Sequence, residues 1–431
     1  MTARGTHALR LLRRACRGLV GLTLAVLPAL APASDAPVLQ LRIVVLRHGV
    51  RSPTSAPAEL APYARRAWRA WPVAPGVLTP HGAQGMQALG DRYRRWLIES
   101  HLWSGDCSTL EQVTVIADST PRNRDSGAAL AKGLAPACDA HYLALDASQN
   151  NPLFHFGNKD IKDDDAPPSA ASRAWPSEAL AELQRVLLDC NDDTCVAQSK
   201  DATRRLFDPT KDDAAARAKT LKTAGSLSEN LMLEYAQGFP AEDVAWGHGD
   251  AATIGRLISL HNLQFGLTKR SMPAASQAAS NLVAHIMASW QQAVGRKPEV
   301  APLAGRGMHA ILLVGHDTNL ANLGGLLDVD WHDERQPDDY PPGGALVFDL
   351  LRDHGKPVVR VSSLMPTLDA LRHADFGGND ALVQHALALA PCHGATTCPL
   401  DVVRDWLSTR VDDGRVDAGM PMLSTWPAAP R

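Results

Sequence analysis

The sequence predicts an α/β fold with a mainly parallel sheet, flanking helices and a helical inserted domain. Two observations lead to this prediction. Short runs of apolar and β-branched residues, typical of buried strands, occur near both ends of the chain with helix-like segments around them. The middle of the chain instead shows helical periodicity over long stretches. With 431 residues, 45% of them hydrophobic, the chain is long enough for two domains.

The predicted strands are short runs in which most side chains are apolar. Strands of a parallel sheet have this pattern, because helices cover both faces and neither face meets water. Helix-like segments at 83–98 and 126–134 accompany the first strands, and this alternation favours a sheet with helices on both sides. The predicted strands are 41–46, 113–117, 310–314, 345–350 and 358–362.

The middle of the chain is rich in Ala, Leu, Gln and charged residues. A run of Asp and Pro at 163–168 marks a loop within it. We therefore predict that 138–302 is a mainly helical insertion, and that 34–137 and 303–431 together build the α/β domain. The predicted helices of the insertion are 178–188, 227–237, 252–267 and 274–294.

The first 33 residues have the three-part order of a secretory signal peptide. Five arginines precede an apolar stretch at 19–30, and a small-residue cleavage pattern follows at 31–33. The apolar stretch is short for a bilayer span, which disfavours a retained membrane anchor. We expect cleavage after Ala33 and export. The segment contains five arginines and no acidic residue, so its removal changes the formal charge from −3 to −8. A nucleic-acid binder would carry a basic excess, so the charge gives no indication of nucleic-acid binding.

The cysteines agree with export. The chain has seven, of which Cys16 lies in the predicted signal peptide, and an even number fits an oxidising compartment. Six buried thiols are the alternative, and no Cys or His cluster has zinc spacing. Proximity in the sequence favours two pairs and leaves a third, namely Cys190 with Cys195, Cys392 with Cys398, and Cys107 with Cys138.

The first predicted strand continues directly into RHGVRSPT at 47–54. In a doubly wound sheet, ligands bind outside the carboxyl ends of the strands. Arg47 and Arg51 suit a phosphate dianion, because guanidinium groups bind phosphate oxygens bidentately and stay charged. His48 could attack phosphorus if it is neutral, and the arginines disfavour its protonation. A solvated basic turn is the alternative, but RHGxRxP arises by chance in on the order of one such chain in ten thousand, at roughly 1/20 per position.

A second candidate, GHDTN at 315–319, follows the strand predicted at 310–314. Asp317 or Thr318 stands where a helix N-cap is expected, and an Asp at such a position is more often a cap than a catalyst. The two roles can coexist in neighbouring residues. His316 could donate a hydrogen bond to a phosphoryl oxygen. A protonated Asp317 could give its proton to the departing alkoxide, which is a poor leaving group.

A third candidate, DSTPRNR at 118–124, follows the strand predicted at 113–117. This segment would bring one more arginine to the same edge of the sheet. The pattern does not distinguish Arg122 from Arg124.

In these segments the sequence resembles the histidine acid phosphatases, the exported branch (branch 2) of the histidine phosphatase superfamily, and among them the bacterial periplasmic phytase type. The resemblance implies a phosphoglycerate-mutase-like α/β domain with a largely helical second domain, and an acid phosphatase in the periplasm or outside the cell. It extends over nearly the whole chain after residue 33. The matching blocks are RHGVRSPT at 47–54, WPVAPGVLTPHG at 71–82, GLAPAC at 133–138, SLHNLQF at 259–265, GHDTNLANLGG at 315–325 and PPGGALVF at 341–348.

The resemblance assigns a role to each matched position. His48 would be the nucleophile that becomes a phosphohistidine, and Asp317 would be the proton donor. The three cysteine pairs resemble bridges of this family. The phosphate would be bound by Arg47, Arg51, Arg122 and His316, with no metal or organic cofactor.

The substrate pocket is less well matched. Thr54 and Glu229 occupy positions that line the pocket in phytases of this type. These phytases carry a lysine directly after the first block, where this chain has Ser55. Loss of that cation weakens the case for myo-inositol hexakisphosphate, a substrate with six phosphates.

Three other functions are open at this stage. A glucose-1-phosphatase or broad sugar phosphatase of the same family typically has Ser after His-Asp, so Thr318 favours the phytase type. The export features disfavour a cytosolic mutase-like relative. An inactive phosphate-binding protein would need neither His48 nor Asp317. We expect a small-molecule phosphate monoester as substrate, no nucleic acid, no stable membrane anchor and a monomeric enzyme.

Overall fold

The computed structural model describes residues 36–155, 175–199, 205–207 and 212–427. Residues Pro37–Arg431 form one compact unit. The predicted signal peptide and the Asp- and Pro-rich loop at 163–168 lie outside the described residues.

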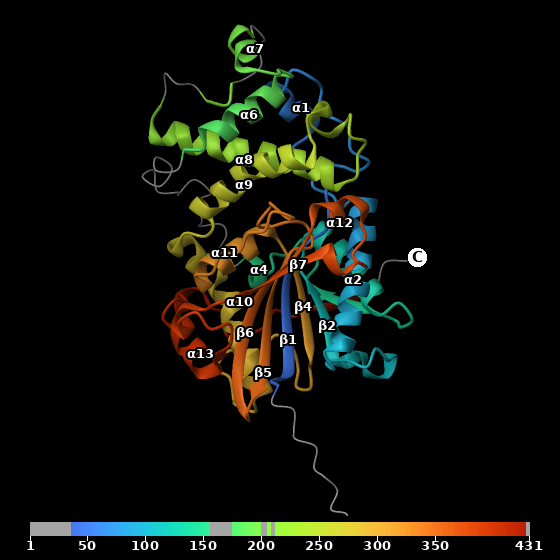
Figure 1. Cartoon of the computed structure of the whole chain (residues 1–431). Helices are drawn as coiled ribbons and strands as arrows, with labels where there is room; N and C mark the ends of the chain where they lie inside the picture. Colours follow the sequence, from blue (N-terminus) through green and yellow to red (C-terminus); the bar gives the residue numbers. More distant parts are fainter. Residues whose placement is uncertain (1–35, 156–174, 200–204, 208–211, 428–431) are drawn as a thin grey trace, which may run out of the picture. The chain divides into compact units, whose positions relative to one another are not determined.

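A single mixed sheet forms the centre of this unit (Figure 1). Its strand order is β7-β6-β5-β1-β4-β2-β3-β9, with β8 paired to β6. All five predicted strands are present, and the described residues contain four further strands that were not predicted. The strands are β1 (Val38–Arg47), β2 (Val113–Ala117), β3 (His141–Ala144), β4 (Ala310–Gly315), β5 (Ala345–Asp353), β6 (Lys356–Pro366), β7 (Leu382–Leu387), β8 (Cys398–Pro399) and β9 (Ser424–Pro427).

The predicted α/β class is confirmed, but the sheet is parallel only in its centre. Strands β1, β4, β2 and β3 pair in parallel, while β1 pairs with β5, and β5 with β6, in antiparallel fashion. A two-residue turn, His354-Gly355, joins β5 to β6, and both residues have positive φ. Such turns connect antiparallel neighbours, whereas parallel strands need a long crossover. The sequence prediction overlooked this turn.

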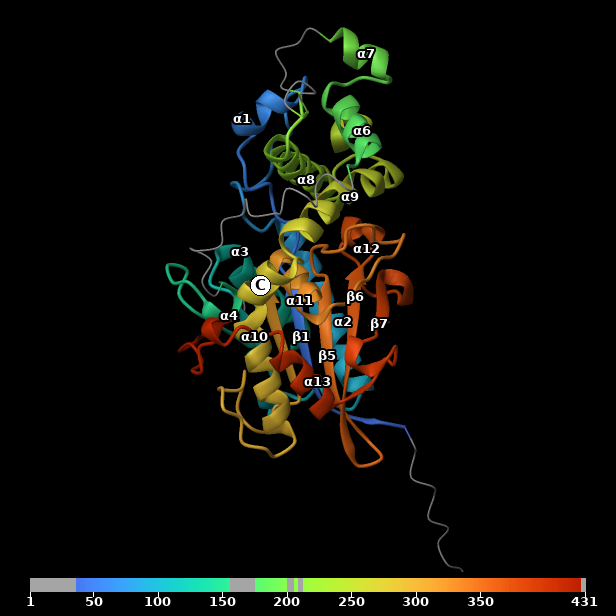
Figure 2. The same cartoon turned by 90° about the vertical axis from the view of Figure 1, so that its left-hand side faces the viewer.

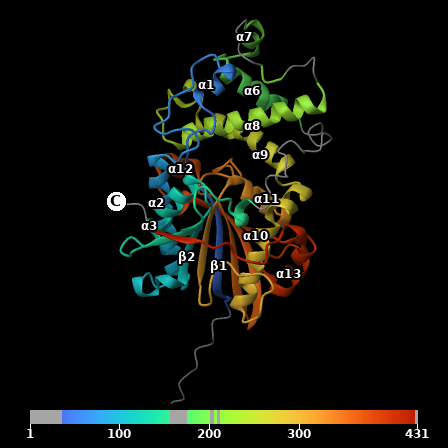
Figure 3. The same cartoon turned by 180° about the vertical axis from the view of Figure 1, so that it is seen from behind.

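Helices cover both faces of the sheet. In β1, Val44 and Leu46 join the core formed with α2 and α3, whereas Ile43 and Val45 join the core formed with α10, α11 and α13. Successive residues of a strand point to opposite faces, so a strand buried on both sides is apolar throughout. Figures 1 and 3 place α2 on one side of the sheet and α10 and α13 on the other, and Figure 2 looks onto α10 and α13.

The helices begin at recognisable caps. Thr79 accepts a hydrogen bond from the Gly82 amide at the start of α2, and Asp213 accepts one from the Ala216 amide at the start of α8. The helices flanking the sheet are α2 (Pro80–Glu99), α3 (Pro121–Leu134), α4 (Pro152–His155), α10 (Met272–Ala293), α11 (Asp317–Leu327), α12 (Leu368–His373) and α13 (Leu400–Ser408). The remaining helices are α1 (Pro57–Leu60), α6 (Ser177–Leu187), α7 (Asp193–Gln198), α8 (Ala214–Ala236) and α9 (Ala251–Thr268).

The predicted helical insertion, 138–302, is wider than the group of helices away from the sheet. Two elements within these bounds belong to the α/β part: strand β3 pairs with β2 in the sheet, and helix α10 packs against the sheet. Helices α6, α8 and α9 lie beyond the carboxyl end of β1 in all three views (Figures 1 to 3). Their apolar side chains are continuous with the core on the α2 and α3 face. A division into two domains therefore stays a proposal, and a helical domain would be narrower than predicted.

All three predicted disulfides are present: Cys107–Cys138, Cys190–Cys195 and Cys392–Cys398. Among the helices of the described residues, none combines the length and the apolar character that a membrane crossing requires.

Two glycines allow α2 and α3 to pack in close contact. A Cβ added at Gly133 would lie 1.8 Å from the Gln87 carbonyl oxygen, and one at Gly90 would lie 2.3 Å from the Leu130 carbonyl oxygen. Backbone atoms cannot yield as a flexible side chain can, so the helices would have to separate.

We expect Gly133→Ala to destabilise the protein by about 1–3 kcal/mol or more, even though Ala is the better helix former by about 1 kcal/mol. The urea midpoint of unfolding measures this loss. Gly305→Ala is the control, because a Cβ there meets nothing within 4 Å. Equal midpoints for the two variants would contradict the packing argument.

Glu234 of α8 makes the stability of the protein depend on pH. Its side chain is buried, accepts a hydrogen bond from the Ala245 amide at 2.9 Å, and burial raises its pKa to about 7. A carboxyl whose pKa is raised in the folded state stabilises fully below its unfolded pKa, near 4.5, and loses that contribution as the pH rises through 7.

Glu234→Gln keeps the acceptor but cannot ionise. We expect this variant to become more stable relative to wild type as the pH rises from 4.5 to 7.5. The difference between their free energies of unfolding should change by at most about 3 kcal/mol. Chemical denaturation at both pH values measures the difference. The exposed Glu178→Gln on α6 is the control, and a pH-independent difference between Glu234→Gln and wild type would refute the assignment.

Candidate active site

The ends of three parallel strands bring the predicted segments together. Arg47, the last residue of β1, pairs with Gly315, the last residue of β4. The His48 amide donates to the Gly315 carbonyl at 3.0 Å, and the Asp118 amide donates to the Val314 carbonyl at 2.9 Å. The chain therefore leaves β1, β4 and β2 at the same level, at the carboxyl edge where ligands bind in such sheets.

His48 is held in one orientation and one tautomer. Its Nδ1 lies 2.9 Å from the Gly49 carbonyl oxygen, which can only accept, so Nδ1 carries the ring proton. The lone pair is then on Nε2, which accepts from Nε of Arg122 at 3.0 Å. Burial, and the charges of Arg122 and Arg47, hold the pKa of His48 well below its ordinary value. The imidazole is therefore neutral even in mild acid.

Gly49 is required by close packing behind the histidine. A Cβ at this position would lie 2.7 Å from Met86 Cγ and 2.8 Å from the Gly82 carbonyl oxygen. The α2 helix therefore supports the turn that carries His48.

Two buried arginines face two carboxylates. Arg47, with no exposed surface, contacts Glu229 of α8 and lies 3.0 Å from Oδ2 of Asp317. Nη2 of Arg51 donates to both oxygens of Glu229, at 3.0 and 3.2 Å. Burial acts to raise the pKa of Glu229, but Arg51 and Arg47 outweigh it, so Glu229 stays ionised. Glu229 thus holds the two arginines side by side.

Asp317 is the first residue of α11, and the N-cap is His316 rather than Asp317 or Thr318. The Thr318 amide donates to Oδ1 of Asp317 at 2.7 Å. Burial acts to raise the pKa of Asp317, but the charges of Arg47 and His261 outweigh it and hold the pKa well below its ordinary value. In this structure Asp317 is therefore an ionised carboxylate beside Arg47.

His316 joins the arginines to a second buried carboxylate. Its Nε2 lies 2.9 Å from Oδ2 of Asp118, which has no exposed surface, and its Nδ1 lies 3.2 Å from Nη2 of Arg122. His155 of α4 also directs Nε2 to Oδ2 of Asp118, at 3.1 Å. Burial lowers the pKa of His316, although Asp118 acts against this. Since Asp118 can only accept, neutral His316 carries its proton on Nε2 and presents a lone pair at Nδ1.

Three more residues support the cluster from behind. The Tyr340 carbonyl accepts from Nη1 of Arg47 at 2.6 Å, and a carboxylate oxygen of Asp338 lies 3.7 Å from the same Nη1. Nδ1 of His261 lies 3.7 Å from Asp338. Burial acts to lower the pKa of His261, but Asp338 and Glu229 raise it above its ordinary value. This charged layer keeps Arg47 rigid.

The structure thus brings together seven predicted site residues and separates others. The local pattern left two arginines equivalent, and the resemblance selected Arg122. In the structure Arg122 reaches His48, while Arg124 donates to the Leu145 carbonyl and stacks on Trp426. Thr54 is exposed, and Ser55 lines a separate pocket beside α8. The residues brought together are Arg47, His48, Arg51, Arg122, Glu229, His316 and Asp317.

Within the described residues, two groups of three side chains have ligand atoms close enough for a metal ion. Their hydrogen bonds and ion pairs explain both groups without one. In the first, the two imidazoles direct their Nε2 atoms to one carboxylate oxygen. In the second, the carboxylates pair with arginines. The groups are Asp118, His155 and His316, and Glu229, His261 and Asp317.

Comparison with known proteins identifies the family. Residues 38–363 match the model of the histidine phosphatase superfamily (branch 2). The chain belongs to this superfamily. It is 33% identical to the phytase AppA of Escherichia coli (strain K12) over 371 residues, which cover 80% of this chain and 85% of AppA. A glucose-1-phosphatase of Providencia rettgeri is 26% identical over 78% of this chain and 82% of its own length.

Solved structures agree with this assignment. The phytase of Hafnia alvei in complex with tartrate has a TM-score of 0.75 and 29% identity, covering 90% of this chain and 100% of its own. The same phytase in complex with myo-inositol hexakis sulphate has a TM-score of 0.73 and 28% identity, with coverage of 90% and 100%. This member of the histidine phosphatase superfamily is a phosphoric monoester hydrolase of the histidine acid phosphatase type.

Sequence reasoning missed the residues that orient the site. Asp118 and His155 hold His316, and His261 and Asp338 lie behind Arg47. Asp118 could have been found, because it directly follows the strand predicted at 113–117. Arg47 and His48 follow the strand predicted at 41–46 in the same way. His155 lies in a four-residue helix without periodicity, so nothing in its surroundings marks it.

Proposed function

We propose that the protein is an exported, phytase-like acid phosphatase that transfers a phosphoryl group to His48. The observation that carries the proposal is the orientation of His48. Its Nδ1 proton is committed to the Gly49 carbonyl, and the lone pair on Nε2 faces the guanidinium of Arg122. A nucleophile needs this combination of a neutral ring and an adjacent cation for the phosphoryl oxygens.

In the first step, Nε2 of His48 attacks phosphorus and the bond to the leaving oxygen breaks. Arg122 would move its hydrogen bond from Nε2 to a phosphoryl oxygen. The Nε groups of Arg47 and Arg51 are buried and have no hydrogen-bond partner among the described residues, so they are available as further donors. Positioning and charge stabilisation of this kind supply most of the rate in phosphoryl transfer.

Asp317 must hold a proton to serve as the acid, although its pKa is low in this structure. The low pKa results from the arginines and His261. A bound phosphate dianion offsets these positive charges and repels an ionised carboxylate, so substrate binding raises the pKa of Asp317. The proton then passes to the leaving oxygen, and the resulting carboxylate activates the water that hydrolyses the phosphohistidine.

The phosphate also changes the role of His316. Neutral His316 has no proton on Nδ1, where Arg122 approaches. The negative charge of the phosphate favours a second proton on the ring, and the carboxylate of Asp118 stabilises the resulting imidazolium. His316 then donates from Nδ1 to the phosphoryl group.

We infer the substrate and the location of the enzyme from its relatives and its disulfides. Similarity to AppA and to the Hafnia alvei phytase supports phytate as a substrate, and similarity to glucose-1-phosphatases supports a sugar phosphate as the second candidate. Three disulfides support export, because disulfides persist in oxidising compartments. We therefore propose that residues 1–33 are removed and that the enzyme acts in the periplasm or outside the cell. We further propose that it acts as a monomer. Specificity constants for phytate, glucose 1-phosphate and an aryl phosphate at acid pH distinguish the candidates.

We expect His48→Ala to lower kcat for an aryl phosphate by about 10³-fold or more, because loss of a nucleophile removes the covalent route. Activity assays together with circular dichroism measure turnover and fold. The exposed His373→Ala is the control and should keep wild-type activity. A folded His48→Ala enzyme with near-normal turnover would eliminate the mechanism and indicate another nucleophile.

We expect Asp317→Asn to affect alkyl esters far more than activated aryl esters. An alkoxide needs a proton to depart and a nitrophenolate does not, so kcat/KM should fall about 10³-fold for glycerol phosphate and much less for p-nitrophenyl phosphate. Asp328→Asn, at the other end of α11, is the matched control. Parallel losses for the two esters in Asp317→Asn would show that Asp317 is not the acid.

A further inference from the structure

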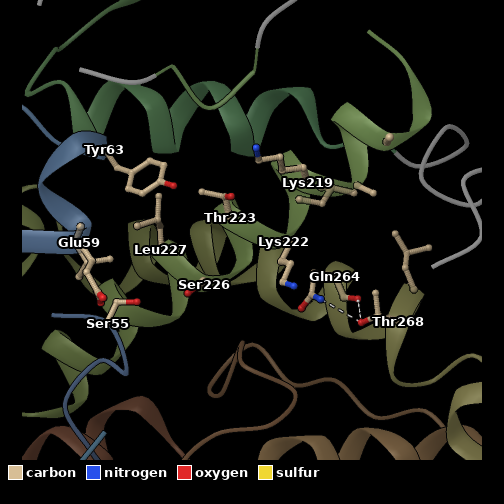
Figure 4. Close-up of a pocket in the computed structure, with 15 residues that line it drawn as sticks. Ser55, Glu59, Tyr63, Lys219, Lys222, Thr223, Ser226, Leu227, Gln264 and Thr268 are labelled. Atoms are coloured by element: carbon tan, nitrogen blue, oxygen red, sulfur yellow. Dashed lines mark hydrogen bonds between the residues drawn. The ribbon is translucent and has the colours of Figure 1, made fainter. Parts of the chain in front are cut away.

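A pocket of about 810 Å³ lies between the loop after β1 and helices α8 and α9 (Figure 4). Ser55 and Glu59 lie at one end of the view. Gln264 and Thr268 of α9 lie at the other end, and Lys219 and Lys222 extend from α8 between them. A cavity of this size can hold a small, highly substituted ring.

The pocket and the candidate active site share helix α8. Lys222, Ser226 and Glu229 follow at intervals of four and three residues, so they share one face of the helix. Lys222 and Ser226 line the pocket, while Glu229 pairs with Arg51. At 1.5 Å per residue, Lys222 lies about 10 Å along the helix axis from Glu229. Ser55, also in the pocket lining, is only four residues beyond Arg51.

The α8 and α9 side of the pocket suits an anion. It carries two ammonium groups, from Lys219 and Lys222, together with the hydroxyl of Thr223. The acidic residue of the lining, Glu59, lies beside Ser55, and its carboxylate accepts a hydrogen bond from the Ala56 amide at 2.9 Å. The negative and positive groups are thus separated along the pocket.

We propose that Lys219 and Lys222 form a second phosphate subsite, which selects substrates with several phosphates over simple monoesters. The proposal rests on the function proposed above, because the subsite would hold the part of the substrate that departs from His48. Phytases of the resembled type carry a lysine at the position of Ser55. Here two lysines of α8 supply positive charge to the pocket from a different element.

The test compares kcat/KM for myo-inositol hexakisphosphate and for p-nitrophenyl phosphate in four enzymes: wild type, Lys219→Gln, Lys222→Gln and the double variant. We expect about a tenfold loss per lysine for the hexakisphosphate, because each substitution removes one cation from a phosphate of the substrate. The aryl phosphate should change less than about twofold, because it has no second phosphate. Lys297→Gln, exposed and outside the pocket lining, is the control.

Adding Ser55→Lys to the double variant should restore part of the preference, because it returns a cation to the same pocket. The subsite is refuted if the double variant keeps the wild-type ratio of the two specificity constants, or if both constants fall together. Either result leaves the proposed function intact as long as wild type turns over the aryl phosphate. If the wild-type enzyme hydrolysed neither the hexakisphosphate nor the aryl phosphate, the proposed function itself would be contradicted.

Discussion

The structure depends on the burial of Arg47 at the end of the central strand. Its guanidinium has no exposed surface and pairs with Glu229 and Asp317, with Asp338 nearby. A buried cation is tolerable only with such partners, because taking a charge out of water costs several kcal/mol. These partners come from α8, α11 and the segment before β5. One ion-pair cluster therefore fixes the position of three elements around the end of β1.

The same cluster explains how carboxylates and arginines are buried together in one site. Glu229 balances part of the arginine charge and keeps Arg47 and Arg51 side by side. The remaining positive charge keeps His48 neutral and Asp317 ionised until a phosphate arrives. In the proposed cycle, phosphate binding reverses the balance of charge at Asp317 and His316. In that cycle, Asp317 would become protonated only when substrate is bound.

The sequence predicted the centre of the fold and the segments that meet around His48, because both depend on local patterns. Apolar runs mark strands buried on both faces, and RHGVRSPT and GHDTN follow two of them. The β5–β6 hairpin and the edge strands were missed, since a His-Gly turn and short edge runs give little periodicity. The local pattern alone could not separate Arg122 from Arg124, because it does not show which face of α3 meets His48, and only the resemblance selected Arg122. His155 and Asp338 depend on long-range packing that no local pattern records.

The most direct test of this account is to trap the phosphoryl enzyme during turnover of a labelled phosphate ester and to locate the label. Alkaline quenching preserves phosphohistidine, and peptide mass spectrometry with ³¹P NMR distinguishes the two ring nitrogens. The hydrogen bond from Nδ1 to the Gly49 carbonyl leaves only Nε2 as nucleophile. The account therefore predicts label on Nε2 of His48. Label on Nδ1, label on another residue, or burst kinetics without any phosphohistidine would contradict it.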